Sequence, residues 1–252
     1  MDICCGYFRG KFYMRKYGDP TAVFREVGNV SAFTINHDVT ELTQENFTSL
    51  GGNACALSYI NGANLAMTLN CLKKENLALA FQGTVTNFAV EASETEEIEV
   101  EELGVLLPLA YIPKKTSVVV TDGATPTPET FVEGEDYIVT SAGIIPLVGG
   151  AITTADTLEI TYTYGVGSVV EGMTTSAQTV EIIFDGINAG EDGEQEVVLR
   201  AWKVKIGPAA TFDLLTTGEF ASLEITGQIL EDSTKIGAGV SKYYNFESRE
   251  VA

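Results

Sequence analysis

The feature that most constrains the fold is a strict alternation of apolar and polar or small residues between residues 63 and 71. Ala63, Leu65, Met67, Leu69 and Cys71 alternate with Asn64, Ala66, Thr68 and Asn70. Because successive side chains of a strand point to opposite faces, this period of two predicts a strand with one apolar face and one polar face. Residues 30–39 show the same period, with Phe33, Ile35 and His37 on one face. Strands are therefore expected to dominate this part of the chain.

A short amphipathic helix is predicted directly after the second of these strands. In residues 72–81, Leu72, Leu77, Ala80 and Phe81 share one helical face, and Gly83 follows where a helix would stop. A strand whose apolar face leads directly into such a helix indicates that the helix covers that face. The opposite face of the strand is left polar and uncharged.

The segment between the two strands, residues 40–60, is polar and contains Gly51 and Gly52. We expect it to form a long loop. A loop of about 20 residues exceeds the usual length in a compact domain, and such loops are commonly functional or ordered only by a partner.

The middle of the chain, residues 84–172, is interpreted as a small β insertion. It opens with an acidic run between Glu91 and Glu102, for which a solvated loop or a sheet edge is the preferred interpretation. Strand patterns follow at residues 116–121, 137–140 and 157–164, separated by turns that contain Pro and Gly. The aromatic side chains of Tyr137, Tyr162 and Tyr164 are available for its core.

The last part, residues 173–252, is again dominated by strands. They are predicted at residues 179–184, 196–206 and 222–230, with a turn at 185–194 and a helical turn around 217–220. Both faces of the strand at 196–206 carry bulky residues, which predicts a central position in a sheet, and Pro208 ends it because proline supplies no ladder donor.

The negative charge of the chain is unevenly placed. The net charge is −20, and residues 84–199 hold 21 of the 35 acidic residues but only Lys114 and Lys115 as bases. A protein of this kind repels nucleic acid over most of its surface, which disfavours a sequence-reading DNA binder. An acidic surface is nevertheless useful near DNA, since a wall that repels phosphate cannot trap it.

No residue constellation predicts catalysis or a metal site. The one histidine, His37, lies within a predicted strand, and nucleophilic catalysis most simply needs a histidine base beside Ser or Cys. Residues 185–196 have the length and the Gly190 of a calcium loop, but Ile187 and Ala189 stand where ligand oxygens are needed. The four cysteines form no C-x-x-C pair. We therefore expect no enzyme activity, no metal and no cofactor.

No stretch has the length or composition of a membrane span or a secretory signal. The longest apolar run, residues 103–112, is about half as long as a span requires. We expect the protein to be made and kept in a reducing cytoplasm.

Three stretches, taken in order, resemble the major tail tube proteins of long-tailed, siphovirus-like bacteriophages. The first is the strand-to-helix junction at residues 69–83, which contains Glu-Asn-Leu-Ala-Leu-Ala before a glycine. The second runs from Val132-Glu-Gly-Glu-Asp-Tyr137 to Ile160-Thr-Tyr-Thr-Tyr164. The third comprises Ile183-Phe-Asp-Gly-Ile-Asn188, residues 197–208, residues 214–223 and Ile229-Leu230. Together the three stretches cover more than half of the chain.

The resemblance implies a mainly β subunit of two packed antiparallel sheets, sandwich-like or barrel-like, flanked by a short α-helix. Residues 1–83 and 173–252 would form the two halves of the tube domain, and residues 84–172 the insertion. Such subunits assemble into hexameric rings that stack into a tube, and sheet edges become contacts between neighbours. The loop at about 40–60 would reach an adjacent ring through Glu41, Thr43, Gln44, Glu45, Asn46 and Phe47.

The resemblance also implies the setting. The protein would be made in the cytoplasm of a bacterial host and end in the virion tail. Its partners would be other copies of itself, a tape measure protein, a tail terminator and distal tail proteins, and DNA would pass through the lumen without specific binding.

The polar faces of the predicted strands suit a tube lumen. The residues expected to face it are Thr34, Asn36, Asp38, Asn64, Thr68, Asn70, Glu181 and Asp185. They would offer hydroxyls, amides and carboxylates to passing DNA. Repulsion between such a wall and phosphate is screened over about 8–10 Å, so charge acts only close to the wall. An ordinary solvent-facing sheet would show the same pattern, and this alternative stays open.

Two other functions remain open at this point. The inner tube of a contractile tail or of a type VI secretion apparatus shares the expected fold. A β-sandwich module that binds carbohydrate or protein predicts clustered exposed aromatic residues, whereas Trp202 lies mid-strand and the tyrosines are dispersed.

Overall fold

The computed structural model describes residues 5–48, 51–190, 195–209, 211–212, 214–215, 217–218 and 220–250. The chain forms two compact units. Unit 1 combines Met1–Val85 with Val170–Ala252, and unit 2 is Thr86–Val169. The sequence analysis divides the chain after residues 83 and 172, whereas the structure divides it after residues 85 and 169.

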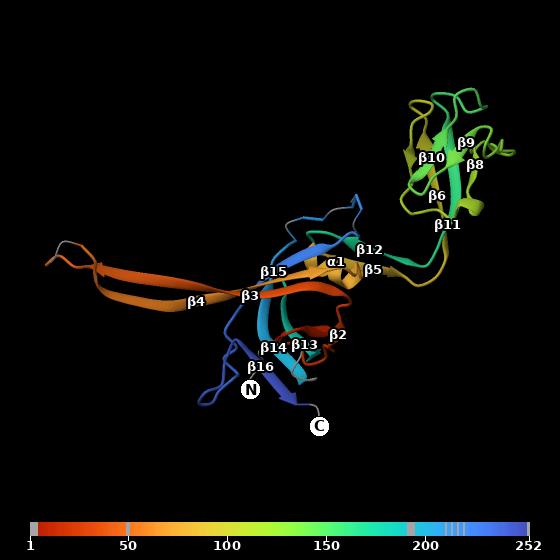
Figure 1. The fold of residues 1–252 in the computed structure, drawn as a ribbon. Helices are drawn as coiled ribbons and strands as arrows, with labels where there is room; N and C mark the ends of the chain where they lie inside the picture. The colour runs from red at the N-terminus through yellow and green to blue at the C-terminus, as the bar shows by residue number, and fades with distance from the viewer. Residues whose placement is uncertain are drawn as a thin grey trace. The chain divides into compact units, whose positions relative to one another are not determined.

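Unit 1 is built on one eight-stranded antiparallel sheet (Figure 1). Its path runs β2-β1-β13-β14-β15-β4-β3, and β16 pairs with β14 off this path. The strands are β1 (Phe8–Lys16), β2 (Arg25–Glu26), β3 (Val30–Glu45), β4 (Asn53–Leu69), β13 (Thr179–Asn188), β14 (Gln195–Ile206), β15 (Leu223–Ile229) and β16 (Tyr244–Glu250). Two packed sheets were expected, but this unit is built on a single sheet. The end strands β2 and β3 of that sheet do not pair with each other to close a barrel.

The core lies on one face of this sheet, as the period of two predicts. Ala63, Leu65, Met67 and Leu69 of β4 are all buried. The sheet is curled so strongly that Phe12 of β1 reaches Phe33 of β3, with ring centroids 4.9 Å apart. A mainly β fold with this core face was correctly predicted from the alternation.

The helix α1 (Lys74–Ala80) covers this core. Leu79 and Ala80 belong to the same buried cluster as the β4 residues. The expectation for Leu72 was wrong: it precedes the helix and is 37% exposed, and Leu79 takes the central position. The helix start is fixed by the fully buried Asn76, whose Nδ2 donates to the carbonyls of Val27 (2.8 Å) and Cys71 (3.0 Å).

β14 is a central strand, as predicted, since it pairs with β13, β15 and β16. The turn expected at residues 185–194 was wrong at its start, because β13 continues to Asn188; residues 191–194 lie outside the described residues. A helical turn was expected around residues 217–220. In the structure Thr217 and Gly218 form a bend, and residue 219 lies outside the described residues.

A pair of glycines lets an aromatic ring lie flat on the sheet. Gly10 of β1 faces Gly186 of β13 in register. A Cβ at Gly186 would lie only 2.4 Å from Cζ of Phe184 and 2.5 Å from the Arg9 carbonyl oxygen. The absence of side chains at this pair is therefore what allows the Phe184 ring to pack against the backbone.

Unit 2 is a small two-layer β structure with its own core. One sheet has the order β6-β11-β8 and the other β7-β10-β9. The elements are β6 (Ala92–Glu99), β7 (Leu107–Pro108), the 3₁₀ helix η1 (Lys115–Ser117), β8 (Val119–Thr121), β9 (Tyr137–Val139), β10 (Gly143–Pro146) and β11 (Thr157–Tyr164). Tyr137 and Tyr162 are buried in the shared core and Tyr164 packs against it, as expected.

The acidic run forms an edge strand. Residues 92–99 make up β6, at the end of its sheet. The Tyr162 hydroxyl donates to the Glu96 carboxylate and accepts from the backbone N–H of Tyr111 (3.2 Å). Burial and this carboxylate raise the pKa of Tyr162. One carboxylate of the run is thereby tied to the core while the strand edge stays charged, which is a common protection of edges against unwanted pairing.

The chain passes between the units through β5 (Thr84–Phe88) and β12 (Gly167–Glu171), which pair with each other. Gly83 is needed at the start of this passage, since a Cβ there would lie 2.2 Å from the Glu171 carbonyl oxygen. Among the described residues, no helix is long and apolar enough to span a membrane.

Candidate functional site

The residues expected to line a lumen lie on the face of the unit 1 sheet opposite the core. Thr34, Asn36 and Asp38 alternate along β3 with the core-facing residues. In the β3–β4 ladder, Asn36 faces Asn64. The Nδ2 of Asn64 also donates to the Asp38 carboxylate at 2.7 Å, which holds this polar cluster together.

Thr68 continues the same face two pairs further along the ladder, opposite Ala32. Asn70 lies just beyond the end of β4, where its side-chain oxygen accepts a bond from the Ser31 hydroxyl at 3.4 Å. The structure therefore brings the five expected residues within β3 and β4 to one side of the sheet, and Asn70 follows directly after β4.

Glu181 and Asp185 share this face but lie on β13, separated from β4 by β14 and β15. Glu181 is not a free carboxylate, because Arg15 of β1 forms an ion pair with it at 2.6 Å and only 13% of its side chain is exposed. Asp185 is exposed and stands in register with Lys11. Glu181 is therefore paired with a cation of the neighbouring strand, whereas the ammonium of Lys11, beside Asp185, forms its ion pair with Glu26 of β2 at 3.4 Å.

The cations on this face were missed by the sequence reasoning. Strands β1 and β14 place them there by register, and they are Arg9, Lys11, Arg15, Arg200 and Lys205. Arg200 pairs with Glu247 of β16 at 3.2 Å. The regular spacing of Lys11, Tyr13 and Arg15 along β1 is the signal that could have revealed part of this set.

The segment 40–60 was wrongly predicted as a loop. β3 and β4 run on together well beyond the sheet and form a two-stranded hairpin that projects from unit 1 (Figure 1). We call residues 39–45 and 53–60 the ribbon. Its pairs extend from Val39↔Ile60 to Glu45↔Asn53. Of the residues expected in an inter-ring loop, Glu41, Thr43, Gln44 and Glu45 lie in the ribbon, and Asn46 and Phe47 begin its turn.

The ribbon carries apolar side chains on both faces, and neither face is covered. Leu42 lies directly opposite Leu57 on one face, beside Tyr59. Val39 lies opposite Ile60 on the other face. All five side chains are exposed. An isolated two-stranded hairpin is marginally stable at best in water, so this ribbon is an element that needs further contacts.

The charges of the ribbon are all negative. Asp38, Glu41 and Glu45 are the charged residues between positions 30 and 69, with no Lys or Arg in that range. Within the part of the chain that the structure describes, neither Glu41 nor Glu45 forms an ion pair.

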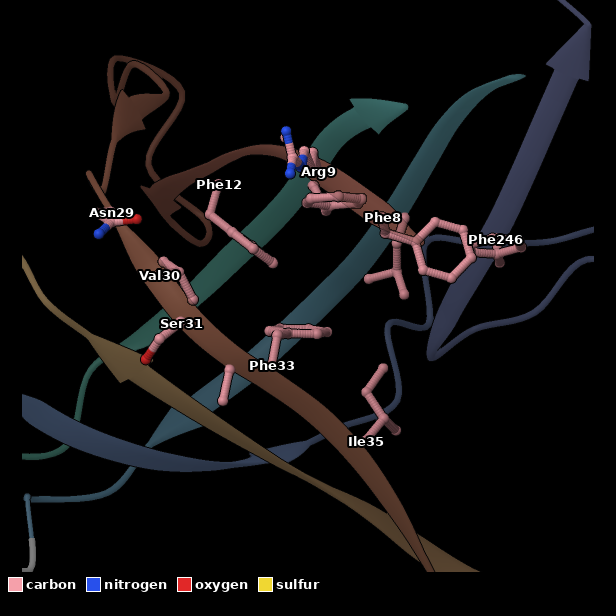
Figure 2. Close-up of a pocket in the computed structure, with 13 residues that line it drawn as sticks. Phe8, Arg9, Phe12, Asn29, Val30, Ser31, Phe33, Ile35 and Phe246 are labelled. Carbon is pink, nitrogen blue, oxygen red and sulfur yellow. The ribbon is translucent and has the colours of Figure 1, made fainter. Parts of the chain in front are cut away.

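A cavity in unit 1 opens between β1 and the start of β3. We call it the aromatic groove. It has a volume of about 610 Å³, and the rings and aliphatic chains that line it are those of Phe8, Phe12, Val30, Phe33, Ile35, Phe184, Leu199 and Phe246. Figure 2 shows the Phe8 and Phe246 rings side by side at one end, where their centroids are 6.1 Å apart. Arg9, Gly10, Asn29, Ser31 and Ala32 also belong to the lining.

The described residues offer little for chemistry. The Nε2 of His37 lies 2.8 Å from the Tyr244 hydroxyl. The described residues contain no group of three or more His, Cys, Asp or Glu side chains placed to hold a metal ion. Cys5, Cys55 and Cys71 are free thiols, and Cys4 lies outside the description. The features that stand out are instead surfaces: the ribbon, the aromatic groove and the open sheet edges.

Comparison with known proteins adds one result. A family model described as Protein of unknown function UCP028589 matches residues 6–247, a span that contains all of unit 2 and nearly all of unit 1. No curated protein matches the chain.

Proposed function

The chain belongs to the family of proteins of unknown function UCP028589, and we propose that it is a structural subunit of a tube. In this proposal copies assemble into hexameric rings, and the rings stack into the tail tube of a long-tailed bacteriophage, through which the genome passes into the host. The resemblance of the sequence to tail tube proteins motivates the proposal, and the ribbon is the observation that carries it.

The ribbon supports self-assembly because a single copy leaves its apolar side chains uncovered. Cross-strand apolar pairs are exposed on both of its faces. Exposed apolar surface of this kind marks an interaction site or an aggregation liability. A hairpin clamped between neighbouring copies buries both faces at once, which turns a marginal element into a contact between subunits.

The sheet of unit 1 supports lateral contacts. β3, with 16 residues, is an end strand of the sheet path, and the end strand β2 has two residues and covers only Tyr13 and Met14 of β1. A long open edge is a template for pairing with another chain. Sheets that join edge to edge around a ring use these edges as seams.

The polar sheet face supports a DNA conduit. Its β3–β4 part carries hydroxyls, amides and Asp38, without a cation. Two of the arginines on the rest of the face are neutralised, Arg15 by Glu181 and Arg200 by Glu247. Cations that are paired in this way offer fewer free sites to phosphate, which favours DNA sliding past this part of the wall.

The resemblance assigns further partners to such a subunit: a tape measure protein, a tail terminator and distal tail proteins. The inner tube of a contractile tail or secretion apparatus is a second candidate, and a sheath around assembled tails in electron micrographs distinguishes it. A binding module would stay monomeric. No described cluster supports an enzyme.

The test is assembly of purified protein, imaged by negative-stain electron microscopy over a concentration series. We expect rings or tubes for the intact chain. In the matched variant, Asn-Gly replaces residues 42–57 and joins the register partners Glu41 and Ser58 through a turn suited to hairpins. This variant is expected to fold as a monomer and not to polymerise. An intact chain that stays monomeric at every concentration and salt would refute the proposal.

A further inference from the structure

A second cavity of unit 1 contains an arginine that the rest of the chain satisfies only in part. This cavity, which we call the Arg25 pocket, has a volume of about 360 Å³ and is lined by residues of β1, β2, α1, β5 and β13. We propose that it binds a small organic acid, whose carboxylate lies on Arg25 and whose short apolar chain fills the pocket. This inference does not depend on the proposed assembly, because all of the lining lies within unit 1 of one copy.

The side chain of Arg25 lies on the core side of the sheet. Arg25 stands opposite Met14 in the β1–β2 ladder, and Met14 is buried in the core. Since residues directly opposite each other share a face, Arg25 lies on the side that α1 covers. There its Nη1 donates to the Oδ1 of Asn76 at 2.8 Å. Asn76 is fully buried and its Nδ2 is bonded to two backbone carbonyls, so the guanidinium is held in place before any ligand binds.

A second edge of the same guanidinium remains available. With Nη1 held by Asn76, the Nε and Nη2 groups have no acceptor among the described residues, and Arg25 forms no ion pair there. Burial lowers the pKa of Arg25, and the nearby Glu75 opposes this shift. A cation that loses water without gaining a charged partner is costly to the fold. The Nε and Nη2 groups form the fork that binds a carboxylate through two parallel hydrogen bonds.

The charges around the pocket favour an anion. Lys16 lies on the same side of β1 as Met14, because it follows at an interval of two, and in the described part of the chain it has no ion pair. Arg15 also belongs to the lining, but its guanidinium is paired with Glu181 on the other face of the sheet. The acid in the lining is Glu75, which is exposed. Lys16 and Arg25 together outweigh Glu75, so the pocket is locally positive in a chain of net charge −20.

The remaining lining determines what the anion carries. Small-molecule sites have volumes of about 300–1,000 Å³, so this pocket suits a small ligand. A carboxylate with a short aliphatic chain would satisfy the cation and cover the apolar wall, whereas inorganic phosphate would leave that wall uncovered. The apolar side chains of the wall are those of Met14, Val23, Ala78, Leu79, Val85 and Val180.

Calorimetric titration with hexanoate tests the site. We expect the intact chain to bind it with a dissociation constant of about 1 mM or lower. The melting temperature should rise with the concentration of hexanoate, since a ligand that binds only the folded state stabilises that state. Hexanol, which lacks the charge, and inorganic phosphate, which lacks the chain, should each bind at least about tenfold more weakly.

Substitutions in the pocket test the carboxylate contact. Arg25→Gln should weaken hexanoate binding at least about tenfold, and Arg25→Lys, which keeps the charge but loses the fork, at least about threefold. Glu75→Gln removes a negative charge near the bound carboxylate and should strengthen binding about twofold to fivefold. Arg249→Gln, at an exposed arginine of β16, is the matched control and should leave binding unchanged. Urea unfolding measures whether each variant is folded.

Each other result refutes a stated part of the inference. If neither the intact chain nor Glu75→Gln binds hexanoate, the site is refuted. Equal binding by a folded Arg25→Gln would mean that the apolar wall alone holds the ligand. If Arg25→Gln does not fold, unchanged binding in Arg25→Lys and Glu75→Gln refutes the contact instead. Phosphate binding as tight as that of hexanoate refutes the ligand class. The proposed tube is tested separately, by assembly of the intact chain.

Discussion

The double variant Leu42→Ala/Leu57→Ala isolates the contribution of the ribbon to assembly. These two leucines face each other on the ribbon face opposite Val39, and they are 55% and 59% exposed. Alanine keeps the backbone pairing of the hairpin and removes most of each apolar side chain. The variant therefore changes a surface that the proposed assembly would bury, while it leaves the core untouched.

The magnitude follows from the exposed fractions. Complete burial of a leucine side chain contributes about 1.5–3 kcal/mol. Since a little over half of each side chain is still exposed, the contact formed on assembly is worth roughly 0.8–1.7 kcal/mol per leucine. Alanine retains a small part of this. The two substitutions together should cost about 1–3 kcal/mol per copy, which corresponds to association weakened by a factor of about 5 to 150.

Sedimentation velocity over a concentration series measures the loss, and thermal unfolding provides the second readout. The melting temperature of the dilute monomer should stay nearly constant, because exposed substitutions away from the core change the free energy of unfolding by about 0.5 kcal/mol or less. Val148→Ala, at a 79% exposed site of unit 2, is the control. If the double variant polymerises at the concentration of the unmodified chain, the ribbon is not the contact that we describe.

Two further predictions concern the stability of unit 1. The buried Asp232 accepts bonds from Thr234 and from the Tyr17 hydroxyl (3.0 Å); burial raises its pKa, but these hydrogen bonds lower it overall. A carboxyl group with a depressed pKa stabilises the fold at pH values above its ordinary pKa, and this stabilisation is lost as the pH falls through the pKa of the folded state. Asp232→Asn should therefore lower the free energy of unfolding by about 1–3 kcal/mol at neutral pH and by less in acid, as measured by urea unfolding. Gly186→Ala should displace the Phe184 ring and cost about 1–3 kcal/mol, visible as a lower urea midpoint; an unchanged midpoint would show that the ring does not need the glycine pair.

The sheet was predictable where one face of a strand is buried. In β4, each core-facing position from Ala63 to Leu69 is apolar, and burial on one side imposes that pattern. The ribbon obeys no such constraint, because both of its faces are exposed in a single copy. Its apolar residues fall on both faces, and the sequence shows no period there. The glycines at 51 and 52, now at the hairpin turn, were the available signal.

The ion pairs across the sheet could not be predicted from the sequence, for a different reason. Arg15 and Glu181 are 166 positions apart, and the register of β1 on β13 decides that they meet. Local patterns specify which face a residue takes but not which distant strand lies beside it. The polar face was thus predicted for the β3–β4 part, where the two strands are joined by a hairpin, and was incomplete for the part that long-range pairing builds.

The placement of charge also bears on how copies meet. Residues 86–169 contain 14 acidic and two basic side chains, so unit 2 of one copy repels unit 2 of another. The ribbon carries Glu41 and Glu45, which form no ion pair among the described residues, together with exposed apolar pairs on both of its faces. Repulsion between the acidic units 2 would disfavour encounters through unit 2 more than encounters through the apolar side chains of the ribbon. In the proposed tube, a subunit must stay dispersed until it adds to the growing end, and this distribution of charge and apolar surface favours that behaviour.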